Sequence, residues 1–196
     1  MHPAISALRK DVQRTYDLLE GERWVRVINC ARAPGVQAVA VYRFGQMIAS
    51  WPTAVRVFVE PLFIFAQFVV RALWGIELPR SAKIGPGLYI GHFGGIIVSP
   101  RAVLGSYCSL SPAITIGMSG EGARNGVPVI GDHVYIAPGA RVFGKIHIGN
   151  NVKIGANAVV YRDLPDNAIV ALPGFKIVSL AGNQHAAGRD AIKDVA

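Results

Sequence analysis

The chain has 196 residues, which is long enough for one sizeable hydrophobic core together with a helical extension. A hydrophobic content of 52% excludes a disordered chain, and the 22 glycines lack the three-residue period of collagen. The net charge of +8 is spread evenly without a basic run, which argues against nucleic acid as a partner and favours phosphate-rich small ligands or lipid headgroups.

Residues 1–76 form a first region with helical character. Apolar residues between positions 5 and 19 recur at the spacing of an amphipathic helix. The sequence Arg-Ala-Pro-Gly at 32–35 interrupts this pattern, and residues 36–49 resume it. We expect this N-terminal α-helical region to serve oligomerisation or to associate with a membrane.

Residues 53–76 are the most apolar part of this region. Arg56, Glu60, Gln67 and Arg71 interrupt the stretch, so it lacks the ~18 uncharged residues expected of a transmembrane span. Two interpretations stay open. The helix is buried against the protein or an oligomer, or it makes a peripheral membrane contact, with its aromatic side in the bilayer and its arginines at the headgroups.

The beginning of the sequence lacks the basic and apolar segments of a secretion signal. Cys30 and Cys108 have neither the spacing of a metal site nor that of a redox motif. We therefore expect two free thiols in a cytoplasmic protein, which either stays in the cytoplasm or lies at the inner face of the cell membrane.

Residues 77–178 have a six-residue period in which an aliphatic residue is commonly followed by a small one. The aliphatic positions are Ile84, Ile90, Ile96, Leu104, Leu110, Ile116, Ile130, Ile136, Val142, Ile148, Ile154 and Val160. A hexapeptide repeat predicts a parallel β-helix, in which short strands form triangular coils and the aliphatic side chains stack inside. A glycine-rich excursion loop at 117–129 interrupts the period, and residues 179–196 form a C-terminal tail without expected core contacts.

Several segments resemble the serine acetyltransferase branch of the hexapeptide-repeat acyltransferases. They are Ala-Lys-Ile-Gly at 82–85, Gly-His-Phe-Gly-Gly-Ile-Ile-Val at 91–98, the excursion loop, and Lys-Ile-Gly-Ala-Asn-Ala-Val-Val at 153–160. The resemblance implies a mainly β fold, namely a left-handed parallel β-helix of hexapeptide repeats with an N-terminal α-helical region. It also implies an acyltransferase that uses acetyl-CoA as cosubstrate and needs no metal.

The resemblance implies a general base and a residue that orients it. His92 matches the catalytic histidine of the family, and Glu77 has the spacing of the family's orienting carboxylate. A carboxylate bonded to one ring nitrogen leaves the other nitrogen free to accept the proton of a hydroxyl. We expect direct acetyl transfer in a ternary complex, with a backbone N–H near Gly94 and Gly95 or in the excursion loop stabilising the oxyanion.

The acceptor site differs from that of the serine acetyltransferases at two positions. Gly91 stands where they have an aspartate, and Val127 stands where they have a second histidine. A site without these polar groups should discriminate poorly for serine. The loop with Arg124 and Asn125 instead resembles relatives that O-acetylate sugars in envelope or extracellular polysaccharide biosynthesis. We therefore expect a sugar hydroxyl as acceptor, in a substrate site made of Gly91, Phe93, Arg124 and Asn125.

The family binds acetyl-CoA between coils of neighbouring subunits, where small residues let the backbone approach. The matching positions here are Gly117, Ala137, Gly139, Ala156 and, near the nucleotide, Lys176. The resemblance also implies a homotrimer, which the N-terminal helices would double into a dimer of trimers.

Two alternatives to the sugar acetyltransferase stay open. One is a true serine O-acetyltransferase of cysteine biosynthesis, which would release thiol from acetyl-CoA in the presence of serine. The other is a non-catalytic, membrane-associated scaffold, which would bind membranes without turning over any hydroxyl acceptor.

Overall fold

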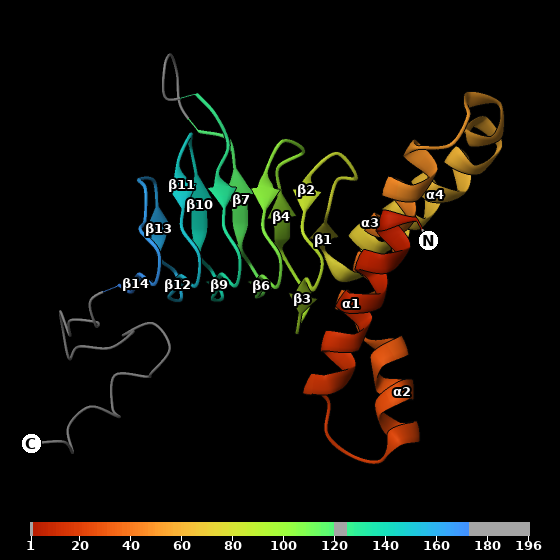
Figure 1. The fold of residues 1–196 in the computed structure, drawn as a ribbon, viewed down its shortest axis with the longest axis horizontal. Helices are drawn as coiled ribbons and strands as arrows, with labels where there is room; N and C mark the ends of the chain where they lie inside the picture. The colour runs from red at the N-terminus through yellow and green to blue at the C-terminus, as the bar shows by residue number, and fades with distance from the viewer. Residues whose placement is uncertain (1, 120–124, 173–196) are drawn as a thin grey trace, which may run out of the picture.

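The computed structural model describes residues 2–119 and 125–172. Four helices come first, namely α1 (Pro3–Leu18), α2 (Arg23–Arg32), α3 (Pro34–Ala49) and α4 (Thr53–Trp74). Short parallel strands follow and stack into a β-helix, and the helices lie at its N-terminal end (Figure 1). Helix α2 has no counterpart among the helices predicted from the sequence.

The strands form three parallel sheets, which we call faces A, B and C. Face A holds β1 (Ile76–Glu77), β4 (Ile96–Val98), β7 (Thr115–Gly117), β10 (Arg141–Phe143) and β13 (Val159–Val160). Face B holds β2 (Lys83–Ile84), β5 (Val103–Leu104), β8 (Val129–Ile130) and β11 (His147–Ile148). Face C holds β3 (Tyr89–Ile90), β6 (Ser109–Leu110), β9 (Tyr135–Ile136), β12 (Lys153–Ile154) and β14 (Ile169–Val170). The chain passes through faces A, B and C in turn, so each round makes one coil.

The aliphatic residues of the repeat line the inside of the β-helix. Each of the predicted positions, from Ile84 to Val160, is at most 6% exposed. Their neighbours in the same strands point outward, as Ile97, Tyr135 and Val159 do. The prediction of a parallel β-helix preceded by helices is therefore confirmed.

Turns between the faces make three edges, which we name by the faces they join. The C–A edge consists of residues 91–95, 111–114, 137–140 and 155–158, and the A–B edge includes the excursion loop between β7 and β8. Successive turns repeat one backbone conformation, because Ala113, Gly139 and Asn157 on the C–A edge all have positive φ angles. The repeat therefore fixes where each turn residue lies.

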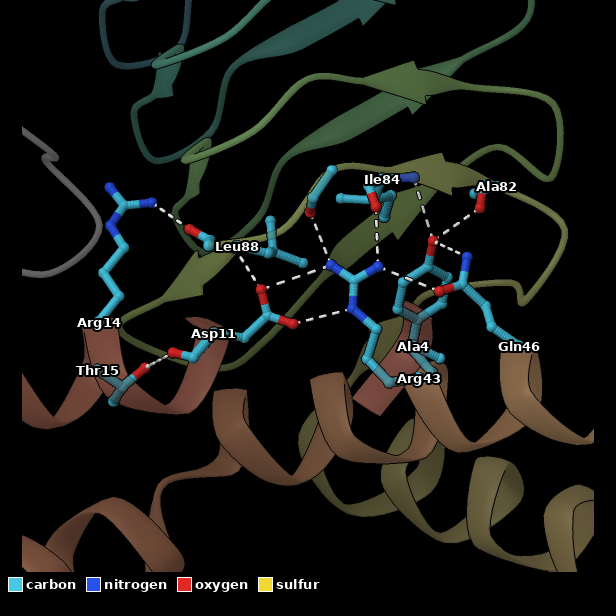
Figure 2. A network of polar contacts seen from close by, with 12 residues as sticks. Ala4, Asp11, Arg14, Thr15, Arg43, Gln46, Ala82, Ile84 and Leu88 are labelled. Atoms are coloured by element: carbon cyan, nitrogen blue, oxygen red, sulfur yellow. Dashed lines mark hydrogen bonds and ion pairs between the residues drawn. The ribbon is translucent and has the colours of Figure 1, made fainter. Parts of the chain in front are cut away.

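The helices close the N-terminal end of the β-helix with polar side chains (Figure 2). The buried guanidinium of Arg43 forms an ion pair with Asp11 at 2.9 Å and donates to the carbonyl oxygens of Ile84, at 2.8 Å, and Gly85, at 2.6 Å. Asp11 accepts the backbone N–H of Leu88 at 2.7 Å. The first coil has no coil below it, so these side chains bond the backbone groups that would otherwise remain unpaired.

Some predicted segments lie outside the described residues. The tail at 179–196 and the end of the repeat region beyond residue 172 belong to this part of the chain, as do residues 120–124 of the excursion loop. The helices end at Trp74 and the first strand begins at Ile76. The register pairs Val103 directly with Val129, so the excursion loop is an insertion within a single coil.

Candidate active site

His92 lies in the first turn of the C–A edge, between β3 and β4, and its side chain is exposed. This turn rests on the end of α4. The backbone N–H of Gly94 donates to the carbonyl of Trp74 at 2.9 Å, and the Phe93 ring packs against the edge of the Trp74 ring with centroids 5.3 Å apart. Trp74 in turn donates to Gln37 of α3 at 3.1 Å. The helices therefore hold the backbone that follows His92.

The glycines of this turn allow the coils to approach closely. Gly94 and Gly95 both have positive φ angles, a conformation that glycine adopts without steric cost. A Cβ atom on Gly95 would lie 3.2 Å from the Cα atom of Ala113 in the next turn of the same edge. A larger residue would displace the turn that carries His92.

Gly91 lies beneath the side chain of Tyr89. A Cβ atom on Gly91 would lie 2.9 Å from the Tyr89 hydroxyl, so this hydroxyl occupies the space next to His92 where the family has its aspartate. The sequence shows Gly91 as the loss of a polar group, and the prediction of the site did not include Tyr89. The signal was available, because residues two apart on a strand point to the same side.

Glu77 lies on β1, next to the strand that follows His92. Strand β1 pairs with β4, which places Glu77 opposite Ile97. The carboxylate forms an ion pair with Arg71 of α4 at 3.5 Å, and both side chains are partly exposed. Within the described residues no hydrogen bond joins Glu77 to His92. The structure therefore places Glu77 and His92 in the same coil, but the predicted contact between them is not formed among the described residues.

Three of the predicted acetyl-CoA positions share the edge of His92. Ala137 and Gly139 lie in one turn of the C–A edge, and Ala156 lies in the next. A Cβ atom on Gly139 would collide with the side chain of Asn157, so this turn accepts no larger residue. Arg141, which is not among the predicted site residues, lies across this edge and donates to the Gly139 carbonyl at 2.9 Å.

Gly117 lies elsewhere, at the A–B edge, where its carbonyl accepts the backbone N–H of Gly144 at 3.3 Å. A groove of about 680 Å³ opens beside it. The lining includes Phe143, Lys145, Tyr161 and Arg162. Within one chain, face A thus separates Gly117 from the turn that carries His92.

Three further predicted residues belong to the loop and the chain end. Asn125 is exposed at the A–B edge, in the returning arm of the excursion loop. Arg124 and Lys176 lie outside the described residues. The predicted grouping of Arg124 and Asn125 with Gly91 and Phe93 is therefore not tested, although Asn125 and Gly91 lie on different edges.

Comparison with known proteins supports the fold. Residues 128–162 match the model of the bacterial transferase hexapeptide family, described as six repeats. A serine acetyltransferase of Synechococcus elongatus is 35% identical over 142 residues, which cover 72% of this chain and 56% of the relative. A match of this length along the chain necessarily includes His92.

The chain is thus similar to hexapeptide-repeat transferases. Solved structures agree with this assignment. The serine acetyltransferase of Neisseria gonorrhoeae superposes with a TM-score of 0.69 and 29% identity, covering 87% of this chain and 66% of that chain. A serine acetyltransferase in complex with CoA has a TM-score of 0.68 at 23% identity, covering 85% of this chain and 65% of that one, and shows the same fold. The β-helix is accordingly left-handed, as the resemblance implied.

The comparisons correct the predicted acceptor. The relatives and the similar structures are named serine acetyltransferases, so the expectation of a sugar hydroxyl in polysaccharide biosynthesis is wrong. That expectation rested on two missing polar residues and on the spelling of one loop. Similarity along most of this chain outweighs those local differences. The chain nevertheless spans only about half the length of the curated relatives it matches.

Proposed function

We propose that this transferase moves the acetyl group of acetyl-CoA to the hydroxyl of serine. One observation carries the proposal, namely the 35% identity to a serine acetyltransferase over a segment that includes the His92 turn. The exposed position of His92 on an edge built of small residues supports it, because substrates reach the imidazole there without displacing a side chain.

His92 acts as the general base. Its neutral imidazole accepts the proton of the serine hydroxyl while the oxygen attacks the thioester carbonyl. The tetrahedral intermediate then collapses, the carbon–sulfur bond breaks, and the imidazolium returns its proton to the leaving CoA thiolate. No covalent acetyl-enzyme forms, and the described cysteines lie buried, away from this edge.

The surroundings of His92 suit this role. Gly94 uses its N–H in the bond to Trp74, whereas no acceptor is recorded for the N–H of Gly95 within the described residues. Gly95 therefore supplies the oxyanion donor in this proposal. Glu77 acts as the positioning residue for His92, and substrate binding turns its carboxylate from Arg71 towards the ring.

Acetyl-CoA lies along the small residues Ala137, Gly139 and Ala156. The side chain of Arg141 on the same edge provides a positive charge for the phosphates of the cosubstrate. A homotrimer in which a neighbouring copy packs on face A would add the groove beside Gly117 to the same site. We propose this assembly, and the mass of the protein in solution tests it.

The decisive experiment measures thiol release from acetyl-CoA with L-serine, and with glycerol and a hexose as controls. We expect turnover with L-serine and a reduction of kcat by at least about 10²-fold in His92→Asn, the usual contribution of a general base. His133→Asn is the matched control, because His133 is an exposed histidine of the B–C edge, and its kcat should stay within about twofold.

Glu77→Gln separates a positioning role from a structural one. Loss of the carboxylate should lower kcat, while the KM for acetyl-CoA and the thermal midpoint stay unchanged. Transfer to the sugar with no transfer to serine would contradict the proposed acceptor. An unaffected His92→Asn enzyme would contradict the proposed base.

A further inference from the structure

Helix α4 has its polar and apolar sides reversed relative to a helix of a water-soluble domain. The residues that face α3 and the first coil include Arg56, Glu60 and Gln67, together with the buried Phe63 and Val70. Glu60 forms an ion pair there with Arg80 at 2.7 Å. Apart from Arg71, the charged and amide residues of α4 thus lie on the side that packs against the protein.

The outward side of α4 is almost entirely apolar. Its exposed large residues are Val55, Val57, Phe58, Leu62, Ile64, Phe65, Phe68 and Leu73. With 3.6 residues per turn, the exposed positions cover an arc of about 200° around the helix. Phe58 is 86% exposed and Phe65 is 64% exposed. Arg71, near the C-terminal end, is the one charged residue at the margin of this arc.

A bilayer accounts for this surface better than a second copy of the chain. A helix that packs against a protein buries a stripe about 100° wide, roughly half of the arc exposed here. The arc runs the length of a helix of 22 residues, or about 33 Å. Its margin carries Arg71, and the whole chain carries a net charge of +8, which complements anionic headgroups.

The contacts of the helices decide how α4 meets the bilayer. By length and composition α4 is able to cross a membrane. However, α3 packs along α4, and Arg43 of α3 is bonded to Asp11 and to the first coil. A spanning α4 would carry this ion pair and the adjoining coil into the hydrocarbon, where both would lose their solvation.

We propose that α4 docks this protein on a lipid bilayer, lying in the membrane plane with its exposed arc in the hydrocarbon. The β-helix then stands on the membrane surface through its helical end, and the His92 turn, which rests on the last residue of α4, lies near the headgroups. Because the attraction is mainly hydrophobic, it persists when salt screens the charges.

Flotation of the full chain with vesicles tests the proposal. The vesicles contain phosphatidylcholine with phosphatidylglycerol, or phosphatidylcholine alone. We expect the wild-type protein to float with both in high salt, and the double variant Phe58→Glu, Phe65→Glu to partition at least about 100-fold less. Ile169→Glu is the matched control, because Ile169 is 75% exposed at the opposite end of the β-helix (Figure 1). This control should float like the wild type.

A conservative variant keeps the test valid if the glutamates disturb folding. In Phe58→Trp, the emission should shift further to the blue on vesicle addition, and be quenched more strongly by brominated acyl chains, than in the wild type with its 3 tryptophans. Ile169→Trp should add nothing to the wild-type change in either measurement. Failure of the wild-type protein to float, or equal flotation of the double variant, would overturn the proposal. The proposal would also be overturned by a larger assembly in solution that the double variant does not form, because a second copy of the chain would then cover α4.

Discussion

The helical end and the β-helix differ in the charged side chains that they bury and the apolar side chains that they expose. The buried positions of the β-helix are mostly aliphatic, and the interior from Ile96 to Ile154 contains no charged side chain among the described residues. The helical end buries the charged Asp11 and Arg43 beside its apolar residues and exposes the apolar arc of α4. The two regions therefore differ in which side chains they shield from water.

The difference follows from what lies beside each backbone segment. Every inner coil bonds its N–H and C=O groups to the coils above and below, so it needs only apolar side chains inside. The first coil has such a neighbour on one side only. Charged and polar side chains of α1 and α3 replace the missing coil, and Arg43 alone reaches two of its carbonyl oxygens.

We expect the largest loss of stability when the ion pair between Asp11 and Arg43 is removed. Asp11→Ala leaves the Arg43 guanidinium buried without its counter-charge, so we expect the free energy of unfolding to fall by about 4 kcal/mol. Asp17→Ala is the control on the same helix, because Asp17 is exposed and its nearest cation, in Arg26, is 3.9 Å away. Its effect should stay within about 0.5 kcal/mol. Equal losses in urea denaturation would mean that the ion pair does not hold the helices to the first coil.

Two neighbouring isoleucines on β4 test how much burial inside the β-helix contributes to the free energy of unfolding. Ile96 is fully buried and Ile97 is 46% exposed, although both lie on β4. Ile96→Ala should lower the free energy of unfolding by about 3 kcal/mol, and Ile97→Ala by less than about 1 kcal/mol. If the two variants lose the same amount, alternation along the strand is not what stabilises the coils.

The repeat was predictable because its signal is local and recurs. Each aliphatic residue with its small neighbour indicates one strand and the turn after it, and the same pattern recurs in successive units. The repeat positions from Ile130 to Val160 could therefore be placed inside the β-helix from the sequence. The helical end has no such redundancy. Asp11 and Arg43 meet across a long stretch of sequence, and nothing in the spacing of either residue announces the ion pair.

The site was predictable only in part, for a related reason. His92 stands in a recognisable turn, whereas the groups around it come from other elements. Arg71 of α4 holds Glu77, and Tyr89 covers Gly91, which the sequence presents as a missing aspartate. The reversed sides of α4 were also hidden, because apolar content is visible in a sequence but the direction that each residue faces depends on the packing.

We expect the smallest effect on stability from the two buried thiols. Their titration compares the β-helix with the helical end through the pH dependence of the free energy of unfolding. Burial raises the pKa of the Cys108 thiol, inside the β-helix, to about 11, and it also raises the pKa of Cys30 in the helical end. A thiol whose pKa is higher in the folded state stabilises the protein fully below the unfolded value of 9.0, and this contribution is lost as the pH rises towards the folded value.

Between pH 9 and pH 11 the wild-type protein should therefore lose about 2 kcal/mol more of its free energy of unfolding than Cys108→Ala does. The comparison with Cys108→Ala removes the titration of lysine and tyrosine, which both proteins share. Cys30→Ala should differ from the wild type by less, because the helical end shields its thiol less completely than the stacked coils shield Cys108. Identical pH curves for the wild type and Cys108→Ala would mean that water reaches the interior of the β-helix, and a larger effect at Cys30 would reverse the order of burial inferred for the two regions.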